Sequence, residues 1–345
     1  MSLKKAIRVL IVDDSLFFRT ALQNALLGDT GLEIIGTASN AKEAEQKIQE
    51  LSPDVVTMDV EMPDMTGTQF LKKLIPVNPL PVILVSAINI GIFEALDAGA
   101  VDFVKKPESA NGSDYAIFCN ELSVKIKIAA TAKVKRTVPA VGALPLPDLK
   151  RTNGNEHIIA IGASTGGTEA TLEILRQFPA DIPGILIVQH MPVGFTKMYA
   201  DRMNRICNFT VLEAQNGDRV KPGQALLAPG DKHMTLAKDY QGYYVKCTDG
   251  EKVSGHRPSV DVLFRSVAQT AGGSAIGVIL TGMGRDGAQG LLEMRKSGAY
   301  TFGQDKASSV VYGMPMVAYD IGAVMKQAPC HALAGLIVQR LNQTR

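Results

Sequence analysis

Three side chains in the second half of the chain are of the types that nucleophilic catalysis requires. Ser164 lies in the turn GASTGG after the apolar segment HIIAIGA, His190 ends the segment GILIVQH, and Asp286 lies in GRDG after AIGVILTGM. A histidine can accept the proton of a serine hydroxyl and return it to a leaving group, while a carboxylate orients the imidazole and stabilises its cation. If the three apolar segments are strands of one parallel sheet, these side chains meet at its carboxyl edge. The pattern predicts a serine hydrolase.

Each of these residues has a simpler interpretation when it is taken alone. The turn around Ser164 is similar to a phosphate-binding turn, although it lacks the spacing G-x-G-x-x-G and no acidic residue ends the next strand. His190 could be a structural residue at a strand end, and Asp286 could cap the helix that follows it. The combination at three strand ends favours catalysis, and the alternative is a Rossmann-like binding module without chemistry.

The other four histidines are weaker candidates for the base. His157 begins its strand, so it should lie at the opposite edge of the sheet, and His331 lies in the C-terminal tail. His233 in APGDKHM and His256 in GHRPS lie on loops that could border the site. We therefore expect His190 to be the histidine that serves the serine.

A second group of polar residues ends the apolar segments of the first third of the chain. Asp13 and Asp14 follow IRVLIV, Asp59 ends VVTMD, and the next two segments lead to Ser86 and Lys106. Converging carboxylates repel one another unless a cation joins them, and an all-oxygen site suits Mg²⁺. An aspartate can accept a phosphoryl group, whose charge the lysine can neutralise. The alternative for Asp13 and Asp14 alone is a cap of the following helix.

Both groups require α/β sheets to position them. Up to about residue 130, five short apolar runs alternate with helix-period segments, which predicts a doubly wound parallel sheet. Prolines, glycines and basic residues break this periodicity over 133–156, as is typical of a linker. The alternation then resumes, with a strand-and-turn-rich segment at 208–255 that predicts a hairpin insertion. We predict a flavodoxin-like first domain, 1–132, and a Rossmann-like second domain, 157–345.

Bulk composition narrows the class of protein. A chain of 345 residues with 46% apolar and 20% charged residues suits two globular domains. No apolar run reaches the roughly 18 residues that a membrane span needs. The four cysteines lie far apart, which favours free thiols in a reducing cytoplasm. No segment carries a dense run of Lys and Arg, which argues against nucleic-acid binding. A transcription regulator is not expected either, because the second domain lacks a basic recognition helix and is too large and strand-rich for a helix-turn-helix output.

The first pattern resembles the response-regulator receiver family over the whole first domain, including MPDMTG after Asp59 and the pair KP after the fifth strand. The resemblance implies that Asp59 is the phosphorylated residue and that a histidine kinase is the phosphoryl donor. It also implies that Asp14 and Asp59 hold Mg²⁺ together with a backbone carbonyl near Glu61. Asp13 would support this metal site.

The same resemblance assigns a switch to the last two strands of the first domain. It implies that Ser86 senses the phosphoryl group, that Phe103 changes its packing in response, and that Lys106 contacts the new charge. The stretch between Ser86 and Phe103 is a few residues shorter than is usual in this family, which bears on the geometry of the signalling face.

Over almost its whole length the chain is similar to the chemotaxis protein-glutamate methylesterase family, CheB. The similarity rests on GASTGG, QHMPVGFT, APGDKHM, HRPSVDVLF, TGMGRDGAQG and SSVVYGMP. It implies hydrolysis of glutamyl methyl esters and deamidation of particular glutamines on chemoreceptors, without a cofactor, by a protein that meets the membrane only through those receptors. It also implies that Ser164 is the nucleophile, His190 the base and Asp286 its orienter, with an oxyanion hole from the backbone of Thr165 and Met283.

A receiver on the same chain as a hydrolase predicts regulation. We expect the unphosphorylated receiver to cover the edge that carries Ser164, and phosphorylation of Asp59 to weaken this docking. Moving such an equilibrium from 1:99 to 99:1 requires about 5.5 kcal/mol, of which one phosphoryl group supplies only a part. Incomplete inhibition is therefore expected.

Overall fold

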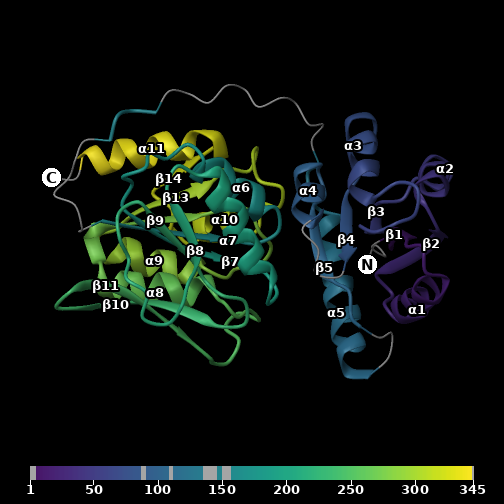
Figure 1. Ribbon diagram of the computed structural model, residues 1–345, viewed down its shortest axis with the longest axis horizontal. Coiled ribbons are helices and arrows are strands. Elements are labelled where there is room, and N and C mark those ends of the chain that lie inside the picture. The colour runs from purple at the N-terminus through teal and green to yellow at the C-terminus, as the bar shows by residue number, and fades with distance from the viewer. Residues whose placement is uncertain (1–4, 87–90, 109–111, 135–145, 150–156, 344–345) are drawn as a thin grey trace. The chain divides into compact units, whose positions relative to one another are not determined.

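The chain forms two compact units, residues 1–139 and 140–345, in a computed structural model that describes residues 5–86, 91–108, 112–134, 146–149 and 157–343 (Figure 1). Most of the predicted linker lies outside the described residues, so the domain bounds stay a prediction. In the described part of the chain, no helix combines the length and the apolar character that crossing a membrane requires.

The first unit contains a five-stranded parallel sheet in the order β2-β1-β3-β4-β5. Its strands are β1 (Ile7–Val12), β2 (Leu32–Ala38), β3 (Val55–Asp59), β4 (Val82–Ser86) and β5 (Asp102–Lys105). Its helices are α1 (Leu16–Leu26), α2 (Ala41–Leu51), α3 (Gly67–Val77), α4 (Gly91–Asp97) and α5 (Gly112–Ala129). Helix α1 packs against α5, and α3 packs against both α2 and α4. These are the five βα units that the sequence predicts.

The second unit contains a seven-stranded parallel sheet in the order β14-β13-β12-β6-β7-β9-β8. Its strands are β6 (Ile158–Ala163), β7 (Gly184–Gln189), β8 (Thr210–Glu213), β9 (Gln224–Leu227), β12 (Ala275–Ile279), β13 (Tyr300–Gln304) and β14 (Lys326–Ala328). Its helices are α6 (Gly167–Leu175), α7 (Phe195–Ile206), α8 (Val260–Thr270), α9 (Ala288–Lys296), α10 (Met314–Asp320) and α11 (Cys330–Gln343). Two parallel α/β sheets confirm the predicted fold class.

The predicted hairpin insertion is smaller than the segment assigned to it. Among its strands, β10 (His233–Asp239) and β11 (Gly242–Thr248) pair as an antiparallel hairpin. The two preceding strands, β8 and β9, extend the main sheet in parallel beyond β7. They are short, and strands of about four residues carry too little periodicity to be distinguished from turns in a sequence.

One face of the second sheet packs on α8, α9 and the hairpin. Alternate residues of the central strands point to this face, because side chains in a strand alternate between its two sides. They form a buried core with residues of α8, α9 and the hairpin, namely Ala160, Leu186, Val188, Leu226, Leu263, Phe264, Val267, Leu291, Met294, Met234 and Val245. Helix α8 is thereby fixed across the sheet, with its first residue close to the ends of the central strands.

In each unit the strand order reverses beside the first strand of the sheet. Strand β1 lies between β2 and β3, and β6 lies between β7 and β12. Chain connections leave such a strand pair in opposite directions, which opens a crevice beyond its carboxyl end. Both groups of candidate functional residues lie at these two positions.

Close packing of α8 on the sheet depends on Gly162 in β6. A Cβ atom at this position would lie 2.1 Å from Cγ1 of Val260, the first residue of α8. We expect Gly162→Ala to lower the free energy of unfolding of the second unit by about 1–3 kcal/mol, as overpacking of a tight core does. Denaturant unfolding of the full chain measures this change.

Gly273→Ala is the matched control, because the nearest atom to a Cβ there is 3.7 Å away. Equal losses of stability in the two variants would contradict the packing argument.

Candidate active site

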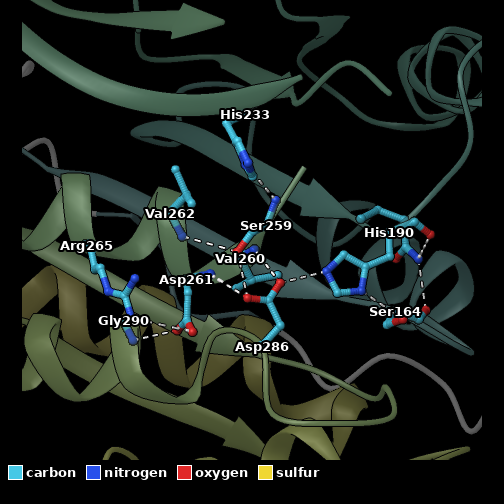
Figure 2. Close-up of polar contacts among 11 residues, drawn as sticks. Ser164, His190, His233, Ser259, Val260, Asp261, Val262, Arg265, Asp286 and Gly290 are labelled. Atoms are coloured by element: carbon cyan, nitrogen blue, oxygen red, sulfur yellow. Dashed lines mark hydrogen bonds and ion pairs between the residues drawn. The ribbon is translucent and has the colours of Figure 1, made fainter. Parts of the chain in front are cut away.

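Ser164, His190 and Asp286 meet at the carboxyl edge of the second sheet (Figure 2). The first two directly follow the last paired residues of β6 and β7, which places them side by side. The hydroxyl oxygen of Ser164 lies 3.2 Å from Nδ1 of His190, and Nε2 of His190 lies 2.8 Å from Oδ2 of Asp286. The imidazole therefore bridges the hydroxyl and the carboxylate, with one ring nitrogen toward each.

The carboxylate of Asp286 is 1% exposed and is surrounded by hydrogen-bond donors. Besides the imidazole, it accepts hydrogen bonds from Ser259 Oγ at 2.7 Å, from the N–H of Val260 at 2.7 Å and from the N–H of Asp261 at 3.1 Å. Burial acts to raise the pKa of Asp286, but bonds from His190, Ser259 and Val260 outweigh it and hold that pKa below its ordinary value. The carboxylate is thus kept ionised beside the imidazole.

These donors show that Asp286 serves the N-terminus of α8 and not the helix that follows it in the chain. Val260 and Asp261 open α8, whose N-cap is Ser259. The sequence interpretation of Asp286 as the cap of the helix after it is therefore wrong, since its carboxylate bonds to the start of α8 and Gly287 takes the cap position of α9. A helix N-terminus concentrates unpaired N–H groups and positive potential, which favours an ionised carboxylate there.

The turn that presents Ser164 is fixed from both neighbouring strands. The N–H of Ser164 donates to Thr281 O at 3.0 Å, and its own carbonyl accepts from Gln189 Nε2 at 2.9 Å and from the N–H of Gly167 at 2.7 Å. A Cβ on Gly282 would lie 2.7 Å from Cβ of Ser164, so the loop after β12 passes directly against the serine. Ser164 is half-buried in this turn.

The two predicted oxyanion donors lie in the segments that flank the serine. Thr165 is buried, and its carbonyl accepts a hydrogen bond from Thr281 Oγ1 at 3.0 Å. Met283 follows Gly282 on the loop after β12, and its side chain is 45% exposed. Their backbone N–H groups stay predicted donors to a developing oxyanion.

The other histidines separate into two groups. His157 lies at the opposite edge of the sheet, with Nδ1 3.3 Å from Ser274 O, and His331 is exposed on α11. His233 accepts a hydrogen bond on Nδ1 from the N–H of Ser259 at 3.3 Å. His256 stacks on His190, with ring centroids 3.7 Å apart and ring planes 10° from parallel. His233 opens β10 and so does not lie on a loop as predicted, and both it and His256 border the site.

Ser259 and Gln189 are site residues that sequence reasoning missed. A serine before the apolar-periodic segment VDVLF is a cap signal, so the start of α8 was detectable. Its bond to Asp286 spans 27 positions of the chain and has no sequence signal. Gln189 is buried at the end of β7, and its amide also donates to the carbonyl of His190 at 3.3 Å.

In the first unit, Asp13, Asp14 and Asp59 converge, each offering a carboxylate oxygen within 4.8 Å of the others. Lys106 Nζ bonds Oδ2 of both Asp13 and Asp59 at 2.7 Å. Burial raises the pKa of Asp13 more than its bond to Lys106 lowers it. Ser15, not an aspartate, caps α1, which contradicts the cap interpretation of Asp13 and Asp14. Three convergent carboxylates form an all-oxygen donor set that fits Mg²⁺.

The predicted switch residues lie on the neighbouring strands. Ser86 ends β4, is buried, and its hydroxyl has no hydrogen-bond partner among the described residues. Phe103 is buried in β5, with Lys125 Nζ 5.3 Å from its ring centroid. The N–H of Glu61 donates to Asp59 Oδ1 at 3.0 Å. Residues 87–90, part of the short stretch between Ser86 and Phe103, lie outside the described residues.

Two doubly wound α/β units, one with clustered carboxylates and one with a Ser-His-Asp arrangement at the sheet edge, define a two-domain α/β protein with a hydrolase-type second unit. Comparison with known families agrees. A family model described as CheB methylesterase matches residues 159–337, and one described as response regulator receiver domain matches 9–113. The chain therefore belongs to the CheB methylesterase family and carries a receiver domain, which makes it a carboxylic-ester hydrolase.

Individual relatives support this assignment over the full length. The chain is 51% identical over 339 residues to "protein-glutamate methylesterase/protein-glutamine glutaminase 2" of Syntrophomonas wolfei, which covers 98% of this chain and 99% of that protein. A protein of Sulfurimonas denitrificans named as a methylesterase/glutaminase is 48% identical, over 92% of this chain and 94% of its own. The crystal structure of the Thermotoga maritima CheB methylesterase catalytic domain matches with a TM-score of 0.53 and 34% identity, over 54% of this chain and 99% of that one.

The lowered pKa of Asp286 leads to a prediction about acid stability. A group whose pKa is depressed by folding stabilises the protein above its unfolded pKa, about 3.9, and loses this effect as the pH falls through the folded pKa. We expect Asp286→Asn to lower the free energy of unfolding of the second unit by about 2 kcal/mol at pH 7. The difference from the wild type should narrow below about pH 4. Denaturant unfolding at a series of pH values measures both effects.

Asp181→Asn is the control, because Asp181 is exposed on a turn of the same unit. A gap between wild type and Asp286→Asn that stays constant down to pH 3 would argue against the ionised, donor-bound carboxylate.

Proposed function

We propose that this protein hydrolyses glutamyl methyl esters on other proteins, and deamidates particular glutamines, with Ser164, His190 and Asp286 as its catalytic residues. One observation carries the proposal: the hydroxyl, the imidazole and the ionised carboxylate form a continuous hydrogen-bonded line at the sheet edge. The substrates are those that the names of the relatives state. We infer that the substrates are methylated chemoreceptors and that the protein acts on them from the cytoplasm.

Each step of ester hydrolysis has a group in position. His190 Nδ1 takes the proton of the Ser164 hydroxyl as the serine oxygen attacks the ester carbonyl carbon. The resulting tetrahedral intermediate collapses, and its methoxy group leaves as methanol with the proton from His190. Water then attacks the acyl-serine, again giving a proton to His190, and the glutamate leaves as Ser164 recovers its hydrogen. A primary amide follows the same route, with ammonia as the leaving group.

The surroundings of His190 favour these proton transfers. When the imidazole is protonated, its cation lies 2.8 Å from a carboxylate that is itself 1% exposed. Charges attract more strongly in such a poorly hydrated position than in water. The negative oxygen of the tetrahedral intermediate would be met by the backbone N–H groups of Thr165 and Met283, and such a donor is typically worth about 3–4 kcal/mol of the barrier.

We further propose that Asp59 accepts a phosphoryl group from a histidine kinase and that this raises the hydrolase activity. Asp13, Asp14 and Asp59 would hold Mg²⁺, which supplies positive charge to the transferred phosphoryl group. Lys106 already bonds Asp59 and could follow the charge onto a phosphoryl oxygen. The hydroxyl of Ser86, which has no hydrogen-bond partner within the described ranges, could donate to another phosphoryl oxygen. A change of packing at Phe103 would then follow from the movement of Ser86.

The catalytic assignment is tested with Ser164→Ala. Removal of the nucleophile should lower methanol release from methyl-esterified receptor by at least about a thousandfold, because nucleophile, base and orienter act as one unit. Released methanol is counted, and binding of the variant to the same receptor is measured by cosedimentation. Thr210→Ala, at an exposed position of the edge strand β8, is the control.

An active Ser164→Ala variant would exclude Ser164 as the nucleophile. A wild-type chain that binds receptor but releases no methanol would favour the non-catalytic binding module instead.

The regulatory proposal is tested with a small phosphodonor and Mg²⁺. Wild-type chain should release methanol faster when both are added, and Asp59→Asn should not respond, since an amide cannot accept the phosphoryl group. A fragment of residues 153–345 alone should release methanol faster than the unphosphorylated full chain. If this fragment is no faster than the full chain, the receiver does not inhibit the hydrolase.

A further inference from the structure

The ring of His256 lies flat against the ring of His190. Their centroids are 3.7 Å apart and their planes differ by 10°. The two in-plane nitrogens of His190 are occupied by Ser164 on one side and Asp286 on the other. These in-plane contacts lie near opposite ends of one line, so they leave the ring free to tilt about that line. A flat group against its face removes this freedom.

The loop that carries His256 holds its backbone in place. Val253 and His256 exchange two backbone hydrogen bonds of 3.0 Å, which closes a two-residue turn. The turn residues Ser254 and Gly255 have φ angles of 53° and 83°, as a tight hairpin turn of type I′ requires. Arg257, the next residue, bonds Oδ1 of Asp231 at 2.6 Å and 2.8 Å. The backbone of His256 is therefore held on both sides along the chain.

The same segment also reaches the carboxylate that orients His190. Ser259, three residues after His256, donates to Asp286 Oδ1 at 2.7 Å. Its backbone N–H is held by His233 Nδ1, and Nε2 of His233 lies 2.8 Å from Glu251 O. Figure 2 shows this line of contacts from His233 through Ser259 and Asp286 to His190. The segment from His256 to Ser259 thus contacts the face of the His190 ring and an oxygen of the Asp286 carboxylate.

We infer that His256 is a positioning residue of the hydrolase, which stacks on His190 and holds the imidazole in the orientation that joins Ser164 to Asp286. The inference rests on the proposed function of the Ser-His-Asp line. His256 acts through its flat ring and carries no proton in the reaction.

The test replaces the ring in graded ways in the full chain. His256→Phe keeps a flat ring, His256→Leu keeps bulk without a flat ring, and His256→Ala removes both. We expect kcat for methanol release to fall about tenfold in Ala and Leu with little change in KM, and to stay within about threefold of the wild type in Phe, because an aromatic pair is worth up to about a factor of ten. His331→Ala, exposed on α11, is the matched control.

Rescue by the aromatic variant separates positioning from a merely structural role. Thermal unfolding of all variants is recorded alongside, so that a loss of stability can be told from a loss of positioning. A wild-type kcat in His256→Ala overturns the inference. So does a Phe variant as slow as the Ala and Leu variants, which would show that the flat ring is not what matters.

A second measurement needs no receptor. In chains labelled with ¹⁵N-histidine, the N–H proton between His190 and Asp286 should give a downfield resonance that Asp286→Asn removes. We expect it to persist in the wild type and His256→Phe and to broaden in Ala and Leu. Unchanged resonances in all variants refute positioning. A wild-type chain that releases no methanol refutes the proposed function, independently of this result.

Discussion

The hydrogen bonds accepted by the Asp286 carboxylate join parts of the chain on which the hydrolase site depends. They connect the loop after β12, the start of α8 and the histidine at the end of β7. A hydrogen bond to a charged group contributes about 1.5–3 kcal/mol, and a buried donor left without its partner costs a comparable amount. The carboxylate therefore accepts hydrogen bonds from the start of α8 and contacts the imidazole at the same time, so one buried charge serves both the helix and the site.

This arrangement constrains the backbone around it. For α8 to reach Asp286, its first residue must lie directly on β6 and on the turn before α9, where a Cβ on Gly162 or Gly287 would lie within 2.5 Å of Val260. The loop carrying Gly282 must likewise pass against Ser164. The glycines of these segments are thus explained by close approach of backbone to side chain. Helix α6, which follows Ser164, begins without a side-chain cap, and hydrogen bonds to the N–H and carbonyl of Ser164 hold the turn before it.

The sequence predicts the sheets and the three strand ends well, because long apolar runs and glycine-rich turns are local signals. β6, β7 and β12 were predictable for this reason, and with them the meeting of Ser164, His190 and Asp286. The short strands β8 and β9 were not, nor was the role of Ser259, since its partner is distant in the chain. A cap of the following helix, α9, was one alternative for Asp286, because a local motif cannot reveal that α8 starts beside it. The stacking of His256 on His190 likewise depends on a loop whose path only tertiary structure fixes.

The two units place different charges at the same edge of their sheets. In the first, three carboxylates and Lys106 converge, and in the proposed function a cation and a phosphoryl group would join them. In the second, one carboxylate is withdrawn behind an imidazole, and a neutral hydroxyl faces the substrate. In the proposed mechanism the carboxylate, which is buried and bonded to α8, would stabilise the imidazolium without meeting the substrate.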